Sequence, residues 1–381
     1  MSSNEIRVLR IIARMNVGGP AWQVSVLTRG LPRHGIENIL ISGEVEAGEA
    51  DYLELRDSNL PVVRLAGLGR SVRLLGDLTA FVSLIRLMRD ERPDIVHTHT
   101  AKAGFVGRLA AIVAGVPVVV HTYHGHLLHG YFWPPVARLI RFVEAVLARR
   151  TTALVAVGAR VRDELLKAGI GDPDRFLVFA PGVVEPPVKD QVTERRTLGW
   201  SSDDRVVLFV GRLTRVKRVD RLLEAMVEVQ EAVPSALLVV AGDGELSDEL
   251  RRMATQAGVR VMFLGWRSDV ASLYAAADLA VLSSDNEGMP VSLLEAAMAG
   301  VPAVTTDAGS ASEVVVDGVT GVVVQRSASS LAAGLVSLLN DAPAIRRMGD
   351  EAQNRAAEEF GVDQLVRNHV DLYRRLVGSS A

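Results

Sequence analysis

Short runs of β-forming residues alternate with helix-length segments from one end of this chain to the other. Thirteen such runs can be identified, among them RVLRII near the start, VPVVVHT in the first half and ALLVVAG in the second. The runs are nearly continuous in apolar residues, as strands are when helices cover both faces of a parallel sheet. The alternation therefore predicts the α/β class, with doubly wound, Rossmann-like parallel sheets.

The length of the chain indicates two such sheets. Its 381 residues exceed a usual domain of about 100–150 residues, and 49% of them are hydrophobic, enough for more than one core. Residues 180–191 (APGVVEPPVKDQ) combine glycine, prolines and charge, a composition typical of a boundary. We predict an N-terminal domain at residues 1–184 and a second domain at 185–360. Because open α/β sheets bind ligands at the carboxyl ends of their strands, two facing sheets would enclose an inter-domain cleft.

Composition excludes several classes of protein. The chain has no cysteine, which rules out a disulfide framework, a thiolate zinc site, an iron–sulfur cluster and a cysteine nucleophile. The formal net charge is −3, so no global positive field favours nucleic acid as a partner. The first residues contain no long apolar segment with a cleavage site, and we therefore expect a cytoplasmic protein. No oligomeric state is predicted.

A stretch without formal charge runs from Leu109 to Ala137, but histidines and prolines interrupt it, so it is too polar to span a bilayer. The segment at residues 131–150 has the pattern of an amphipathic basic helix preceded by three aromatic residues. One interpretation is a helix packed on a sheet with a solvated basic face. The alternative is peripheral contact with anionic lipid at the inner face of the plasma membrane.

Two motifs in the first half could form part of a site. Gly18 and Gly19 stand between the first strand and a helical stretch, where glycine lets the backbone approach a ligand and helix N–H groups favour anions. An ordinary strand-to-helix turn has the same pattern, so this motif alone is weak. Six of the eight histidines fall between residues 97 and 129, at the ends of two predicted strands. They predict a polar cleft lining that hydrogen-bonds hydroxyl-rich substrates, with His99, His121 and His126 among the candidates.

A metal site is the rival interpretation of the histidines. His97 and His99 are two apart on a strand, so their side chains face the same way and could ligate one ion. The neighbourhood lacks an anionic ligand, however, since no carboxylate lies between Asp94 and Glu144. We therefore expect no metal.

The second half carries the more specific motifs. Arg212 follows the strand RVVLFV and Lys217 lies where the next helix begins, so the two cations can converge on one phosphate-sized anion. Further on, Glu287 precedes Gly288 in a loop, and Glu295 lies about one turn inside the following helix. Free N–H groups at that helix start favour a phosphate, and the two carboxylates could accept hydrogen bonds from sugar hydroxyls.

Together these motifs resemble the GT-B glycosyltransferases, specifically the retaining nucleotide-sugar enzymes of glycosyltransferase family 4. The resemblance runs over nearly the whole chain and rests on NVGGPA, HTYHG, GRLTRVK, AGDGEL and, above all, EGMPVSLLEAAMAG, which matches the family's Glu-x7-Glu pattern. It implies a GT-B fold of two Rossmann-like domains. It also implies that the final segment, residues 361–381, crosses back to the N-terminal domain.

The resemblance assigns roles by position. His124 matches the active-site histidine, with His121 and His126 close enough to leave the register open, and Glu287 contacts the transferred sugar. The remaining positions are assigned to donor binding: Gly18 and Gly19 near the diphosphate, Arg212 and Lys217 on it, Arg267 where the base is held, Gly288 and Met289 in the loop, and Glu295 on the ribose.

The resemblance further implies transfer with retention and without a metal or other cofactor. Fixed cations and helix amides would stabilise the leaving diphosphate in place of a divalent ion. We expect a front-face path that moves a hexosyl or N-acetylhexosaminyl group from a nucleoside-diphosphate sugar, UDP-sugar before GDP-mannose. The acceptor would be a hydroxyl of a glycan, a lipid-linked glycan or a small glycoside.

Three rivals stay open. A sugar-nucleotide epimerase or hydrolase of the same fold would bind the diphosphate with the same residues. A non-catalytic protein would bind the nucleotide sugar without turnover. A histidine-metal hydrolase would lose activity in chelator.

Overall fold

The computed structural model describes residues 5–46, 48–69, 71, 73–125 and 133–378. The chain divides into two compact units. Unit 1 consists of Met1–Gly182 and Val362–Ala381, and unit 2 of Val183–Gly361. The chain therefore passes between the units twice. The two passages lie side by side within unit 2, since Val183 N donates a hydrogen bond to Phe360 O at 2.7 Å.

Unit 1 is built on a seven-stranded parallel sheet in the order β3-β2-β1-β4-β5-β6-β7. Its strands are β1 (Ile6–Ile12), β2 (Ile36–Ser42), β3 (Val62–Arg64), β4 (Ile95–His99), β5 (Val118–Tyr123), β6 (Ala153–Ala156) and β7 (Phe176–Val178). Its α-helices are α1 (Gly19–Gly30), α2 (Tyr52–Leu55), α3 (Leu74–Glu91), α4 (Ala101–Ala114), α5 (Pro134–Arg149), α6 (Ala159–Lys167) and α15 (Val362–Gly378), with 3-10 turns η1 (Leu31–His34) and η2 (Pro173–Arg175).

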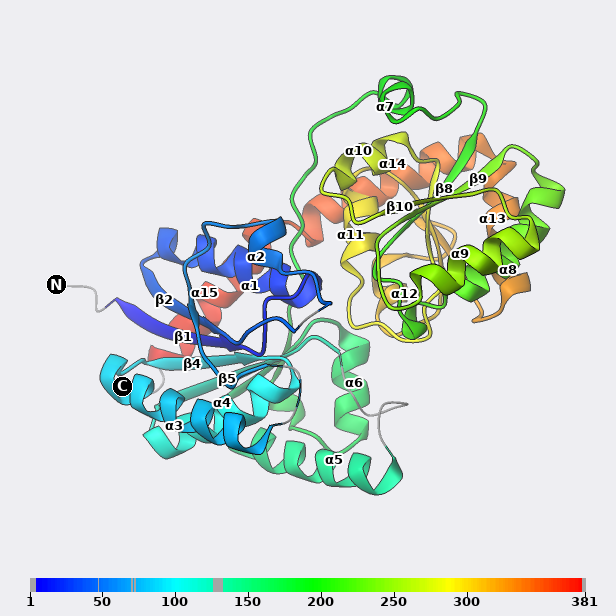
Figure 1. Ribbon diagram of the computed structural model, residues 1–381. Helices are drawn as coiled ribbons and strands as arrows, with labels where there is room; N and C mark the ends of the chain where they lie inside the picture. Colours follow the sequence, from blue (N-terminus) through cyan, green and yellow to red (C-terminus); the bar gives the residue numbers. More distant parts are fainter. Residues whose placement is uncertain (1–4, 47, 70, 72, 126–132, 379–381) are drawn as a thin grey trace. The chain divides into compact units, whose positions relative to one another are not determined.

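Alternate side chains of β1 enter different cores, as the period of a strand requires. Val8 packs with α1 and α15 on one face of the sheet, whereas Leu9 and Ile11 pack with α3 and α4 on the other. Figure 1 shows these helix pairs on the two sides of the sheet. Arg10 lies between the apolar residues and points to the α1 side, where it is fully buried.

Unit 2 repeats the arrangement with six parallel strands in the order β10-β9-β8-β11-β12-β13. Its strands are β8 (Arg205–Val210), β9 (Ala236–Ala241), β10 (Val261–Gly265), β11 (Leu279–Leu282), β12 (Ala303–Thr306) and β13 (Gly321–Val324). Its helices are α7 (Gln191–Leu198), η3 (Arg215–Lys217), α8 (Val219–Ala232), α9 (Ser247–Ala257), α10 (Val270–Ala276), α11 (Val291–Met298), α12 (Ala311–Val314), α13 (Ala328–Leu339) and α14 (Ala342–Glu359).

Local signals set the ends of several helices. Asp190 and Asp341 accept hydrogen bonds from backbone N–H groups three residues on and so cap α7 and α14. Gly115 and Gly258 end α4 and α9 in the left-handed conformation, with φ of 75° and 68°. These helices begin and end where short-range sequence chemistry places them.

The predicted fold class is confirmed, because both sheets are parallel and each lies among alternating helices. In each sheet the strand order reverses at one point, between β1 and β4 in unit 1 and between β8 and β11 in unit 2. Doubly wound sheets bind ligands beside such a point, outside the carboxyl ends of the strands. Among the described residues, no helix is long and apolar enough to cross a membrane.

Candidate functional site

Two loops flank the reversal point of the unit 2 sheet and carry five of the predicted residues, Met289 among them. Residues 211–218 follow β8 and contain Arg212 and Lys217, and residues 283–290 follow β11 and contain Glu287 and Gly288. Lys217 Nζ donates to Glu287 Oε1 at 2.5 Å, and both side chains are largely buried, with 15% and 11% exposed. The two loops thus bring together a cation and a carboxylate that stand 70 positions apart.

Two further side chains complete this edge of the sheet. Ser284 Oγ donates to the same Glu287 oxygen at 2.5 Å, so the carboxylate is held from two sides. Arg212 is exposed on the loop, and no described residue pairs with its guanidinium. An exposed guanidinium on the same loop as a lysine offers two cations of different geometry for one anion.

Neighbouring loops pack on this backbone so closely that only glycine fits. A Cβ on Gly242, after β9, would lie 1.9 Å from Gly211 O, and a Cβ on Gly309, after β12, would lie 1.8 Å from Glu287 O. Both glycines have positive φ, 146° and 51°. The AGDGEL motif therefore has a packing role, because it lets the β9 loop support the loop that carries Arg212.

Helix α11 begins directly after the loop. Pro290 is its N-cap residue, and Leu293 N donates to Pro290 O at 3.0 Å, which leaves the N–H groups of Val291 and Ser292 without an acceptor inside the helix. Met289 is buried beside it. Glu295 is half-buried on the helix and lies near Tyr274, whose phenol pKa is raised by burial first and by the Glu295 charge second.

Arg267 lies after β10 and forms a two-point ion pair with Asp269. Its Nε donates to Asp269 Oδ1 at 2.7 Å, and its Nη2 donates to the other oxygen. Asp269 holds the pKa of the guanidinium above its ordinary value, and Arg267 holds the pKa of Asp269 below its ordinary value. Asp269 thus fixes the orientation of the Arg267 guanidinium.

In unit 1 four of the predicted residues, Gly18, Gly19, His99 and His124, lie at or after the carboxyl ends of β1, β4 and β5. Gly18 is the N-cap of α1 and Gly19 is its first residue. His99 ends β4, beside Ile12 of β1 and Thr122 of β5 in the ladder. His99 Nδ1 and His124 Nε2 lie 3.1 Å apart, and their ring centroids are 5.4 Å apart. One ring donates and the other accepts.

A buried polar cluster lies behind this pair. His97 stacks on His99 with 4.3 Å between ring centroids and is hydrogen-bonded to Tyr373 Oη at 2.6 Å and to Thr122 Oγ1 at 2.7 Å. His369 of α15 stacks on His97 at 5.7 Å. Arg10 completes the cluster. The part that His369 and Tyr373 of α15 play here was not predicted, although an arginine inside the apolar run RVLRII was a visible signal.

The charges of this cluster are unusual. Arg10 Nη2 donates to Val24 O at 2.7 Å and to the Thr28 hydroxyl, while Nε and Nη1 have no partner among the described residues. Burial lowers the pKa of Arg10 to about 10. Burial, and then the charge of His369, lower the pKa of His124 to about 3. His124 is therefore neutral near pH 7 and is a hydrogen-bonding group there, since a base with so low a pKa takes up no proton.

The structure separates His121 from the other histidines. Thr98 Oγ1 and His121 Nδ1 are 2.8 Å apart, and the ring lies under α4, where a Cβ on Gly104 would come within 2.4 Å of it. His97 and His99 point to the opposite face of the sheet, towards α1 and α15. His121 therefore lies apart from the His99–His124 pair. His126 lies outside the described residues. No group of three His, Asp or Glu side chains arranged for a metal occurs within the described part of the chain.

Two family models match the chain. The model "Glycosyl transferases group 1" matches residues 190–355, and "Glycosyl transferase 4-like domain" matches residues 18–182. Among curated relatives, the Escherichia coli UDP-Gal:alpha-D-GlcNAc-diphosphoundecaprenol alpha-1,3-galactosyltransferase is 30% identical over 337 residues, 86% of each chain. The D-inositol 3-phosphate glycosyltransferase of Xylanimonas cellulosilytica is 30% identical over 387 residues, 94% of this chain and 92% of its own.

Solved structures share the whole fold. Anabaena Alr3699/HepE, in complex with UDP and glucose, aligns with a TM-score of 0.81 and 23% identity over 97% of this chain and 100% of its own. The sucrose-phosphate synthase of Thermosynechococcus elongatus aligns with a TM-score of 0.84 and 21% identity over 98% of this chain and 100% of its own.

Proposed function

The chain belongs to the GT-B glycosyltransferases of the family 4 type, and on that premise we propose that it is a retaining hexosyltransferase with a UDP-sugar donor. The observation that carries the proposal is the pair formed by Lys217 and Glu287 at the reversal point of the unit 2 sheet, with Arg212 exposed on the loop that carries Lys217. Nucleotide ligands of doubly wound sheets bind at that point.

The proposed donor site follows from the charges of these loops. Lys217 and Arg212 bind the diphosphate, Glu287 contacts the transferred sugar, and Glu295 accepts from the ribose hydroxyls. The N–H groups at the start of α11, after Gly288 and Met289, add fixed dipoles of the sign that stabilises a leaving phosphate. Arg267 stays assigned to the base. Because these groups together neutralise the diphosphate, we propose that transfer requires no metal.

Retention is proposed through a front-face path. The leaving diphosphate oxygen takes the proton of the acceptor hydroxyl while that hydroxyl oxygen forms the new bond to the anomeric carbon and the bond to the diphosphate breaks. The low pKa of His124 supports this path, because a neutral imidazole can orient a sugar hydroxyl yet is too weakly basic to remove its proton. Gly18 and Gly19 stay assigned to the donor, and His99 positions His124.

The donor and acceptor classes rest on similar proteins. The Escherichia coli relative is named for UDP-galactose and a diphosphoundecaprenol-linked GlcNAc, and HepE was solved with UDP and glucose. We propose a UDP-hexose as donor and a lipid-linked glycan as acceptor. GDP-mannose and a small glycoside acceptor are the next choices.

A surface of unit 1 supports a lipid partner. Helix α5 exposes Leu139 and Phe142, 61% and 66% accessible, beside Arg138 and Arg141. Helix α5 is buried at its C-terminal end, at Leu147 and Ala148, while Leu139 lies on its exposed face. Neighbouring α3 and α4 add further exposed apolar side chains: Leu74, Leu75, Leu78, Phe105, Leu109 and Val113. Tyr131 and Phe132, two of the predicted aromatics, lie outside the described residues.

We propose that this three-helix surface contacts an anionic membrane. Contiguous apolar area is rare on monomers and marks an interaction site, and arginines beside it favour anionic lipid as the occupant. Leu139→Glu and Phe142→Glu should reduce co-sedimentation with phosphatidylglycerol vesicles, whereas Val192→Glu, at an exposed apolar position of unit 2, should not. Equal vesicle binding by all variants would contradict the proposal that this surface contacts the membrane. A concentration-dependent dimer without vesicle binding would instead assign the surface to contact with a second copy of the chain.

The activity has a direct test. The protein is incubated with UDP-galactose or UDP-glucose and a GlcNAc-diphospholipid, and the anomeric configuration of the product is read by NMR. Arg212→Ala and Lys217→Ala should each reduce transfer strongly, while Arg252→Ala, an exposed cation on α9, should not. Near-wild-type turnover in both site variants would overturn the assignment. Epimerised donor, donor hydrolysis alone, or binding without turnover would support the epimerase, the hydrolase or the binding protein instead.

A further inference from the structure

The two loops of the donor site are fastened to each other on the side away from Lys217 Nζ. Asp285 N donates to Val216 O at 2.9 Å, and Ser283 Oγ donates to Lys217 O at 2.9 Å. These bonds fix the backbone of one loop on the other. The side chains of Lys217 and Glu287 extend from these joined backbones and lie within hydrogen-bond distance of each other.

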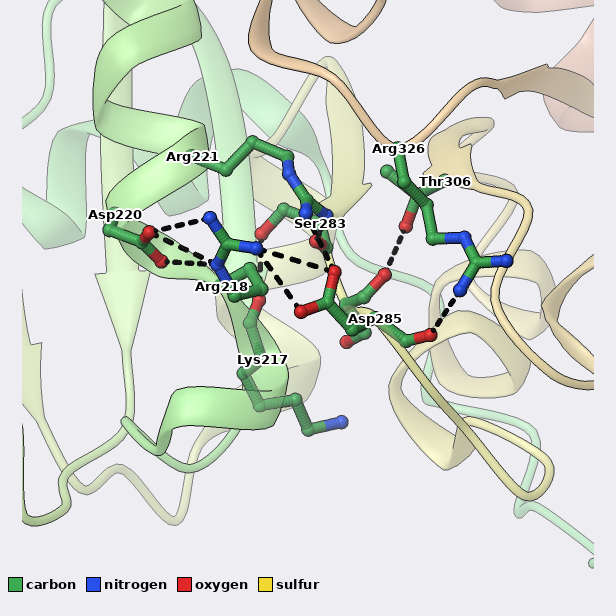
Figure 2. Close-up of polar contacts among 9 residues, drawn as sticks. Lys217, Arg218, Asp220, Arg221, Ser283, Asp285, Thr306 and Arg326 are labelled. Carbon is green, nitrogen blue, oxygen red and sulfur yellow. Dashed lines mark hydrogen bonds and ion pairs between the residues drawn. The ribbon is translucent and has the colours of Figure 1, made fainter. Parts of the chain in front are cut away.

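Asp285 is the centre of this fastening (Figure 2). Its carboxylate accepts from Arg221 Nη2 at 2.6 Å and from Arg218 Nη1 at 3.1 Å. Arg221 also donates to Ser283 O at 2.8 Å, and Arg326 donates to Asp285 O at 3.0 Å. Figure 2 shows the Lys217 side chain pointing away from this group. Three arginines, two at the start of α8 and one in the loop after β13, therefore hold the short segment that leads to Glu287.

Arg218 makes this contact from an unfavourable backbone conformation. It has φ 51° and ψ 45°, the left-handed region, at the residue before α8. For a residue with a Cβ this conformation is unfavourable, whereas glycine adopts it freely. The guanidinium accounts for its presence there, because it bridges Asp220, at 2.9–3.0 Å, and Asp285.

Exposure limits what this pair adds to the stability of the fold. The side chains of Arg218 and Asp285 are 33% and 42% exposed, and ion pairs of this kind add little to the free energy of unfolding. Their positions suggest a geometric role instead. Arg218 directly follows Lys217, and Asp285 stands two residues before Glu287.

We propose that Arg218 and Asp285 form a clamp that positions Lys217 and Glu287 for the donor, and that Arg218 is a positioning residue of the reaction. The inference rests on the proposed function, because it assigns the clamp to the same donor site. Without the clamp the loops separate more readily, and a misplacement of about 1 Å can cost about a hundredfold in a reaction that depends on positioning.

The test compares two substitutions at one position. Arg218→Ala removes the clamp and keeps the left-handed strain, whereas Arg218→Gly removes both, so the glycine variant should melt roughly 2–4 °C higher than the alanine variant. Both should bind UDP about tenfold or more weakly by calorimetry. Gly258→Ala is the matched control, because it introduces the same strain at φ 68° in unit 2, with no atom within 4 Å of the new Cβ. It should lower the melting temperature without changing UDP affinity.

A ligand-free measurement separates the clamp from the function. Amide exchange of residues 211–218 and 283–290 should accelerate in both Arg218 variants and stay unchanged in Gly258→Ala. Unchanged amide exchange in the Arg218 variants overturns the clamp, whatever their affinity for UDP. Recovery of UDP affinity in Arg218→Gly also overturns it, because affinity would then follow strain. A wild-type protein that binds no UDP, while its Arg218 variants exchange faster, leaves the clamp standing and refutes the UDP-dependent function.

Discussion

Acidification from pH 7 to pH 5 should destabilise unit 1 far more than unit 2. All eight histidines of the chain belong to unit 1, and none to unit 2. Burial lowers the pKa of five of them, to about 3 for His124 and about 4 for His369, and well below the ordinary value for His97, His99 and His121. The unfolded chain, with ordinary pKa values near 6.5, takes up these protons first.

The sign and the size follow from linkage. A histidine whose pKa is lowered by folding stabilises the fold above pH 6.5, and that stabilisation is lost as the pH falls towards the folded pKa. Between pH 7 and pH 5 a histidine with a folded pKa of about 3 or 4, such as His124 or His369, costs about 2 kcal/mol, so these two cost about 4 kcal/mol. His97, His99 and His121 add a cost of the same sign, and the whole stability of a domain is only about 5–15 kcal/mol. Carboxylates contribute little, because most of them titrate below this window.

The protein is equilibrated in increasing urea at pH 7 and at pH 5. A short amide-exchange pulse at one fixed pH then labels the unfolded segments, and the labelled peptides report the unfolding of each unit separately. Peptides from unit 1 should unfold at much lower urea at pH 5, and peptides from unit 2 should change little. Equal shifts in the two units, or no shift in unit 1, would refute the interpretation of the histidines as buried and neutral.

Three further variants test particular contacts. Gly309→Ala should reduce UDP binding at least tenfold and lower the melting temperature of unit 2, because its Cβ would lie 1.8 Å from Glu287 O; calorimetry measures both effects. Arg10→Met should raise the pKa of His369, measured by NMR titration, because it removes a buried positive charge that lowers that pKa. Tyr373→Phe should cost about 1–3 kcal/mol in a urea melt at pH 7, because it leaves a buried imidazole nitrogen on β4 without its partner.

Much of the fold could be predicted from the sequence because its signals are local. Apolar runs, turn glycines and capping aspartates act over a few residues, and the rule for parallel sheets places the ends of β8 and β11 together. Both loops were therefore expected at a ligand-binding edge, whereas the ion pair between Lys217 and Glu287 was not predicted. The boundary segment at residues 180–191 was visible in its prolines.

The side-chain networks could not be predicted in the same way. Arg218 and Asp285 are 67 positions apart, and their contact depends on how α8 packs against the β11 loop. The histidines show the same limit. His97 and His99 share a face by strand alternation, but β5 ends at Tyr123, so the alternation that places His121 no longer fixes His124. The contact of α15 with His97 could not be placed from local patterns either, since Tyr373 and His97 are 276 positions apart.

The two passages of the chain between the units have a consequence for biosynthesis. Ribosomes complete β1 to β7 first, then the about 180 residues of unit 2, and only then α15, which carries His369 and Tyr373. At about 5–20 residues per second this delay is roughly 10–35 s, during which the face of β1 and β4 that α15 later covers has no partner. Until α15 is translated, nascent unit 1 lacks His369 and Tyr373, and His97 is without its hydrogen bond to Tyr373. Unit 2, uninterrupted in the chain, can complete its fold before the unit that precedes it.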